Sequence, residues 1–363
     1  MQLSALIEQM ESIAPTRHAE SWDNVGLLAG DPSQSISNVL LTIDYTREVA
    51  DEGKKLGCDA VIAYHPPIFK PLKSITAPSL IYDAIRRGVA IYSPHTALDV
   101  ADGGTNDVLC DLLGLVERSP LKIVETKSSQ LKLVTFVPES AVDAVSAALF
   151  AAGAGRIGNY SQCSFRSPGI GTFFGEAGSN PAVGESGKLE RADEIRIETV
   201  VPANRIAQIV AALRAAHPYE EPAFDLLQLA APPEPRGMGR IGTLPASVEC
   251  AALFERLKKD LEIPSLLVAG PAAGPIKRVA VCAGACGDLL DSAIAQKADL
   301  YITGEMRHHD ALKAAAAGLT VVCTLHSNSE RITLKRLKDR LEQSLPGLRL
   351  HLSAADRDPF VIH

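Results

Sequence analysis

The fold is decided by one stretch of the chain, which reads Leu319-Thr320-Val321-Val322-Cys323-Thr324-Leu325-His326-Ser327-Asn328-Ser329-Glu330. Its first six residues are apolar or β-branched and predict a buried strand, and a helical pattern begins near Glu330. Functional side chains of parallel sheets gather where strands end, so His326 and Glu330, four residues apart, could meet at one point. Imidazole and carboxylate are common metal ligands, and the stretch therefore indicates a metal site.

A second copy of this pattern occurs earlier in the chain. The apolar run at residues 91–93 leads into His95, and Asp99 follows four residues later. A single His-x-x-x-carboxylate pattern is a weak signal, because a histidine at a strand end is usually structural. Two copies at equivalent places favour one site built from both.

The two copies lie inside a longer internal repeat. The first part has strand patterns at residues 39–44, 60–64 and 89–92, separated by helical patterns at 49–56 and 80–87. The second part has strand patterns at 279–282, 299–303 and 319–324, separated by helical patterns at 288–296 and 311–317. This alternation predicts parallel βαβ units. The expected fold class is therefore α/β, with two pseudo-repeated βαβ halves that form one body around the metal site.

Length and composition are those of an ordinary globular protein. With 363 residues, 46% hydrophobic and 22% charged, two or three domains are expected. The formal net charge of -7 argues against a nucleic-acid partner. No apolar run has the length of a membrane span, and the first residues lack a signal-peptide pattern, so we expect a cytoplasmic protein with no membrane partner.

The seven cysteines lie mostly inside apolar runs. An odd number without a framework spacing predicts reduced thiols. Cys282 and Cys286 do not have zinc-finger spacing, and we interpret them as small residues packed at a strand-to-helix turn.

The middle of the chain has a different organisation. Strand patterns occur at residues 131–138, 160–174 (broken by Pro168-Gly169), 194–202 and 223–229, with helical patterns at 141–152 and 205–216. Strand–helix–strand twice over predicts an inserted ferredoxin-like α+β domain. A proline-rich linker follows at 232–235. The expected domains are therefore 1–127, the insertion 128–231, and 232–363.

Several further residues are candidates for the site. Trp22, the only tryptophan, precedes Asp23 and Asn24, which indicates either a wall of the site or a buried tryptophan with an Asx turn. His65 ends a strand and is held by the two prolines that follow it. Glu305 ends the equivalent strand of the second half, where it would orient ligands or transfer protons.

A pair of adjacent histidines follows Glu305. His308 and His309 begin a helical pattern, so their side chains point about 100° apart. At most one of them is expected to face the site.

The joint pattern resembles the GTP cyclohydrolase 1 type 2 homologue (NIF3-like) family over both outer segments. The motifs that carry the resemblance are Ser21-Trp22-Asp23-Asn24-Val25-Gly26-Leu27, Tyr64-His65-Pro66-Pro67-Ile68-Phe69, His95-Thr96-Ala97-Leu98-Asp99, Gly304-Glu305 with His308-His309, and His326-Ser327-Asn328-Ser329-Glu330-Arg331. The middle segment resembles the inserted domain of the longer members, which is similar to PII-like and CutA-like proteins.

The resemblance implies two divalent metals per chain between the α/β halves, and a toroidal homohexamer built as a trimer of dimers. The implied metal ligands are His65, Asp99, His326 and Glu330. The expected proton-transfer residues are His95 and Glu305. The expected substrate-binding residues are Trp22, Asp23, Asn24, Tyr64 and His309. The implied substrate is a purine nucleotide such as GTP.

One position departs from the family pattern. Many bacterial members have a histidine pair where this chain has Tyr64-His65, and a neutral phenol is a poor ligand.

The ligand types suit zinc, iron, manganese or nickel. Two such metals would activate a bridging water for hydrolysis. The alternative is a non-catalytic metal-binding scaffold or regulator whose inserted domain binds partners or an effector.

Overall fold

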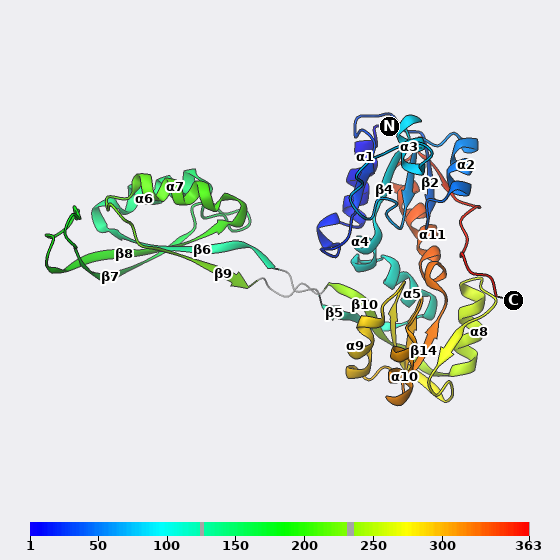
Figure 1. Ribbon diagram of the computed structural model, residues 1–363. Coiled ribbons are helices and arrows are strands. Elements are labelled where there is room, and N and C mark those ends of the chain that lie inside the picture. The colour runs from blue at the N-terminus through cyan, green and yellow to red at the C-terminus, as the bar shows by residue number, and fades with distance from the viewer. Residues whose placement is uncertain (124–126, 231–235, 363) are drawn as a thin grey trace. The chain divides into compact units, whose positions relative to one another are not determined.

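The computed structural model describes residues 1–123, 127–230 and 236–362, and the chain divides into two compact units (Figure 1). The main unit comprises Met1–Val124 and Pro235–His363, and the middle unit comprises Glu125–Glu234. Each unit has its own buried core. No helix among the described residues is long and apolar enough to cross a membrane.

The first sheet of the main unit has the strand order β1-β4-β3-β2-β15. Its strands are β1 (Gly26–Ala29), β2 (Asn38–Thr42), β3 (Ala60–Ala63), β4 (Ala90–Ser93) and β15 (Arg349–Leu352). Strands β15, β2, β3 and β4 are parallel, and β1 is antiparallel to β4. Helix α2 (Arg47–Leu56) and helix α3 (Leu80–Arg86) make the crossovers. All residues of β2, β3 and β4 are buried, as expected for parallel strands covered on both faces.

The second sheet of the main unit has the order β11-β14-β13-β12-β10-β5. Its strands are β5 (Val116–Ile123), β10 (Gly237–Glu249), β11 (Leu267–Ala269), β12 (Pro275–Cys282), β13 (Leu300–Thr303) and β14 (Thr320–Cys323). Strands β12, β13 and β14 are parallel, and helix α9 (Leu290–Ala295) and helix α10 (His308–Ala316) connect them. The predicted mixed α/β fold with βαβ units is therefore confirmed.

The remaining helices of the main unit are α1 (Leu3–Ile13), α4 (His95–Val100), α5 (Thr105–Leu113), α8 (Cys250–Asp260) and α11 (His326–Ser344). Helix α11 begins directly after β14 and contacts β2 and β15 of the first sheet (Figure 1). The prediction that this helix begins near Glu330 is wrong, since it begins four residues earlier. Leu325, with φ 71°, makes the sharp turn that allows helical backbone to start at His326.

The middle unit is a four-stranded antiparallel sheet with the order β7-β8-β6-β9. Its strands are β6 (Lys127–Pro138), β7 (Ser164–Phe174), β8 (Leu189–Pro202) and β9 (Phe224–Ala230). Helix α6 (Val142–Ala151) and helix α7 (Ile206–Ala216) cover one face of this sheet (Figure 1).

The predicted break at Pro168-Gly169 does not occur. Strand β7 pairs with β8 without interruption from Ser164 to Phe174. Strand β7 lies at the edge of the sheet and has a neighbouring strand on one side only. A proline that faces the open side removes no hydrogen bond between strands, so the strand continues through Pro168.

The expectation that all cysteines are reduced is also wrong for one pair. Cys282 and Cys286 form a disulfide at the end of β12. Their Cα atoms are 6.0 Å apart, within the usual range for such a bond, because the chain turns sharply between them. The other five cysteines are free thiols.

Candidate metal centre

Three predicted ligands from the two halves of the repeat lie together in the main unit. His65 follows β3, while His326 and Glu330 lie on the first two turns of α11, after β14. One ligand atom from each of the three lies within 4.8 Å of the others. Among the described residues, these three form the group of imidazole, thiol or carboxylate side chains whose ligand atoms lie close enough together to hold one metal ion.

Two of these ligands are histidines whose outer nitrogens are held by carboxylates. His65 Nδ1 lies 2.9 Å from Asp44 Oδ1, and His326 Nδ1 lies 3.0 Å from Glu305 Oε1. A carboxylate at Nδ1 keeps the proton there and leaves Nε2 available as a ligand. Both rings therefore have the orientation that metal binding requires, with Nδ1 on a carboxylate and Nε2 toward Glu330.

Glu330 lies between the two Nε2 atoms and is only 3% exposed. Its Oε2 is 3.2 Å from His65 Nε2, and its Oε1 is 3.4 Å from His326 Nε2. Within the described part of the chain, His65 Nε2 and Glu330 Oε2 are buried and face each other as an ion pair without the geometry of a normal hydrogen bond. Buried polar atoms normally have a well-directed partner, and a cation bound by both atoms would supply one.

The charges of this group are strongly coupled. Burial opposes ionisation of His65, but the carboxylates of Asp44 and Glu330 outweigh it and raise the pKa of His65 to about 10. The Glu330 carboxylate, against burial, raises the pKa of His326 to about 9. Burial alone would raise the pKa of Glu330, yet the two histidines hold it below its ordinary value. The metal-free site therefore holds protons where a metal would bind, and metal binding must release them.

Asp99 lies near this group but is engaged elsewhere. The Tyr64 hydroxyl donates a short hydrogen bond to Asp99 Oδ1 and lies 2.9 Å from Thr105 Oγ1. Burial, followed by the charge of Glu330, raises the pKa of Asp99 to about 6. Burial, followed by the charges of Asp99 and Glu330, raises the pKa of Tyr64, so the phenol stays neutral. Asp99 is thus outside the three-residue group, and its side chain is held by Tyr64.

His95 belongs to the same region and is anchored in the same way. Its Nδ1 is 2.7 Å from Asp23 Oδ1, and Asp23 Oδ2 also accepts from the Thr96 hydroxyl at 2.5 Å. The His95 and His65 ring centroids are 5.4 Å apart. Asp23 therefore serves as a support for His95.

Trp22 is 58% exposed, so the alternative of a buried tryptophan is wrong. Its ring makes edge contacts with His95 at 6.1 Å and with Phe69 at 5.9 Å between centroids. It forms an aromatic wall beside His95. Asn24, in contrast, donates to the carbonyl of Ile68 at 2.5 Å and holds the loop after β3.

The remaining predicted residues, Glu305 and the pair His308 and His309, lie at the second sheet. Glu305 is half exposed and supports His326, as described above. His308 and His309 begin α10, with ring centroids 5.3 Å apart. Among the described residues, the contacts of the three-ligand group do not include His309.

Two residues of the site were missed by sequence reasoning. Asp44 lies two residues after β2, and Gly284 lies two residues after β12, at the equivalent place in the repeat. Gly284 has φ 71°, and a Cβ there would lie 2.8 Å from Glu330 Oε1. Aligning the two halves strand by strand would have drawn attention to both positions.

Comparisons with known proteins find relatives that match nearly the whole chain. A family model described as Duf34/NIF3 (NGG1p interacting factor 3) matches residues 1–359. The chain belongs to the Duf34/NIF3 family. A relative from Halalkalibacterium halodurans, called "GTP cyclohydrolase 1 type 2 homolog", is 39% identical over 98% of this chain and 97% of its own. A Bacillus subtilis relative of the same name is 36% identical over the same shares.

Solved structures show the same relationship between this Duf34/NIF3 chain and other proteins. A Bacillus cereus protein related to NIF3 is 35% identical, with TM-score 0.66, over 100% of this chain and 99% of its own. The Staphylococcus aureus protein SA1388 is 27% identical, with TM-score 0.77, over the same shares. The family resemblance seen in the sequence is therefore confirmed.

Proposed function

We propose that this chain is a metal-dependent hydrolase that acts on a nucleotide-like substrate. The observation that carries the proposal is the group of His65, His326 and Glu330, whose ligand atoms lie within 4.8 Å of one another, with His65 Nε2 and Glu330 Oε2 buried 3.2 Å apart. The ligand types suit zinc, iron, manganese or nickel. The names of the relatives support a nucleotide as the substrate class.

Each residue of the site has a role under this proposal. A bound divalent cation would supply Lewis acidity and lower the pKa of water near it. Asp44 and Glu305 fix the histidine ligands in the correct tautomer, as the Nδ1 contacts support. His95, held by Asp23, moves a proton to or from the substrate, and Trp22 lies beside it to receive a planar ring.

A second metal position is part of the proposal. Asp99 would join Glu330 in holding it, since the charge of Glu330 already acts on Asp99. Because Tyr64 binds Asp99 and is itself neutral, this position should be the weaker of the two. Mild chelation is expected to remove one metal before the other.

The test begins with metal content. The Glu330→Gln variant keeps the shape of the side chain and should lose most of the metal found in the purified parent by elemental analysis. Glu342→Gln, on the exposed side of the same helix, is the matched control and should keep it. Equal metal content in Glu330→Gln and in the parent would contradict the assignment of Glu330 as a metal ligand.

Hydrolysis is then measured on a panel of purine and pyrimidine nucleotides with each metal added in turn. The parent should turn over at least one nucleotide, and Asp99→Ala should not. If the protein binds metal but hydrolyses no nucleotide of the panel, the enzyme proposal is refuted and the non-catalytic metal-binding scaffold is favoured.

We also propose that the middle unit is an inserted PII/CutA-like domain that folds by itself. Its complete antiparallel sheet, two helices and separate core support this. Joining the flanks through a short Gly/Ser linker should leave a soluble main unit that still binds metal. Insoluble protein, or soluble protein without metal, would contradict the proposal.

A further inference from the structure

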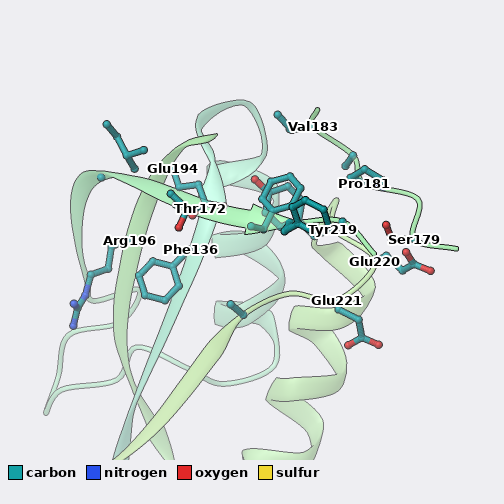
Figure 2. Close-up of a pocket in the computed structure, with 18 of the residues that line it drawn as sticks. Phe136, Thr172, Ser179, Pro181, Val183, Glu194, Arg196, Tyr219, Glu220 and Glu221 are labelled. Carbon is teal, nitrogen blue, oxygen red and sulfur yellow. The ribbon is translucent and has the colours of Figure 1, made fainter. Parts of the chain in front are cut away.

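The middle unit contains a pocket of about 570 Å³ that the proposed hydrolase does not use. It is bounded by strand β7, by the loop at 175–183, and by the turn after α7 (Figure 2). All of its lining residues belong to the middle unit, whereas the candidate metal ligands belong to the main unit. A pocket of this volume is in the range that small organic ligands occupy.

The walls of the pocket are largely apolar. They include Phe136, Ile170, Phe174 and Val183, and three of these are large side chains exposed to solvent, with Phe174 52% exposed. In Figure 2, Pro181 and Val183 lie on the loop at one side, with Tyr219 between that loop and the strands. Exposed apolar side chains gathered around a hollow favour a ligand with an apolar body.

The charged groups of the pocket are mostly acidic. The four lining carboxylates are Glu176, Glu194, Glu220 and Glu221. The one lining arginine, Arg196, is already paired with Glu198 at 2.9 Å, outside the pocket lining. The pocket therefore presents a net negative charge to whatever enters it.

The four carboxylates differ in their partners. Glu221 is paired with Arg214 at 3.0 Å, and Glu220 accepts the Asn180 N–H at 3.2 Å. Glu194 has no basic partner among the described residues, and it is half-buried.

Glu194 has two close neighbours in the pocket. Its carboxylate rests over Gly171 of β7, where a Cβ would lie 2.2 Å from Glu194 Oε2, so the backbone gives it room. The Tyr219 hydroxyl is buried beside it, and burial together with the neighbouring Glu194 carboxylate raises the pKa of Tyr219, so this hydroxyl stays neutral. Glu194 therefore has a neutral hydroxyl beside it and no counter-charge, which suits a ligand that carries a positive charge.

We propose that this pocket binds a small organic cation, an amine with a planar or branched apolar body. The ammonium group would pair with Glu194 and lie against the ring of Tyr219, while the apolar body would cover Phe173, which the register places on the same face of the sheet as Glu194. Anionic ligands, including nucleotides, are excluded by the surrounding carboxylates, so the pocket is a second site and not an extension of the hydrolase.

The test uses the full chain and three probes with one apolar body and different charges. These are 2-phenylethylamine, 2-phenylethanol and 3-phenylpropionate, with binding measured by ligand-observed NMR titration. The amine should bind at least about tenfold more tightly than the alcohol, and the carboxylate should not bind. Removal of metal with a chelator should leave amine binding unchanged.

Variants locate the binding. Glu194→Gln, which preserves the side-chain shape, should weaken amine binding about tenfold and leave the alcohol unchanged. Phe173→Ser removes the apolar wall on the face of Glu194 and should weaken both probes. Glu139→Gln, an exposed carboxylate of the middle unit outside the pocket, is the matched control and should bind as the parent does.

Several results would overturn the proposal. Equal binding of the amine and the carboxylate would show that charge plays no part. Unaltered amine binding in folded Glu194→Gln, verified by circular dichroism, would place the amine elsewhere. Binding of no probe, together with self-association that Phe173→Ser abolishes, would assign the surface to a second copy of this chain.

Discussion

Replacing Tyr64 by Phe removes one buried hydroxyl and tests how Asp99 is shared between protein and metal. The Tyr64 side chain is fully buried, and its hydroxyl is the donor that satisfies Asp99. Phenylalanine fills nearly the same volume, so packing should change little. What changes is that Asp99 loses a hydrogen bond and becomes available to a metal.

The expected size of the effect follows from the type of bond. At pH 8 Asp99 is ionised, because its pKa is raised only to about 6. A hydrogen bond to a charged group contributes ~1.5–3 kcal/mol, so the metal-free variant should lose about that much free energy of unfolding. With saturating metal the loss should be smaller. If the second position gains tenfold in affinity, about 1.4 kcal/mol is recovered.

The assay is denaturant unfolding at pH 8 with and without metal, followed by tryptophan fluorescence. Trp22 is the only tryptophan and belongs to the main unit, so the signal reports on the unit that holds the site. Tyr92→Phe is the matched control, because the buried Tyr92 hydroxyl has no hydrogen-bond partner among the described residues. Removing it should cost nothing.

The result that refutes the reasoning is an equal loss of stability with and without metal. Asp99 would then not turn to a metal when the phenol is gone, and the proposed second position would have to be built otherwise. No loss in either condition would show that the Tyr64–Asp99 bond contributes nothing to stability.

Three further predictions follow from single contacts. Asp44→Asn should weaken metal binding ~10–100-fold by calorimetry, because the ring of the neighbouring ligand loses its anchor. Gly284→Ala should lose metal by elemental analysis, since its Cβ would press on Glu330. Gly88→Ala, also at positive φ but with open space around it, should keep the metal. Burial lowers the pKa of His217 in the folded state. At pH values near the ordinary pKa of histidine, this side chain is therefore protonated more often in the unfolded state than in the folded state. The middle unit should therefore lose stability as pH falls below about 6.5, and His217→Gln should reduce this pH dependence in unfolding followed by circular dichroism.

The strands that carry the site could be predicted because each is a short, fully buried parallel strand. Such strands read as continuous apolar runs, and the pattern at residues 60–64 matches β3 (Ala60–Ala63) to within one residue. The spacing of His326 and Glu330 was equally readable, since four residues on a helix bring two side chains to one face. Local pattern therefore sufficed for the strands and for this pair of ligands.

Strands with mixed surroundings could not be predicted in this way. Strand β5 is an edge strand with mostly exposed residues, and it has no apolar run that marks it. Its partner β10 continues beyond the buried part of the sheet. The contact between Tyr64 and Asp99 spans 35 positions of sequence and exists only through the packing of α4 against the first sheet. No local pattern reports such a contact.

The two His-x-x-x-carboxylate copies look equivalent in sequence, and the structure shows why they are not. In the second copy the carboxylate of Glu330 reaches both His326 and His65, so one residue serves both halves of the repeat. In the first copy the carboxylate of Asp99 is held by Tyr64, and His95 is turned toward Asp23. A site made by facing repeats does not need both copies to do the same work. His326 and Glu330 of the second copy form the three-residue group together with His65, whereas Asp99 and His95 of the first copy are held by Tyr64 and Asp23.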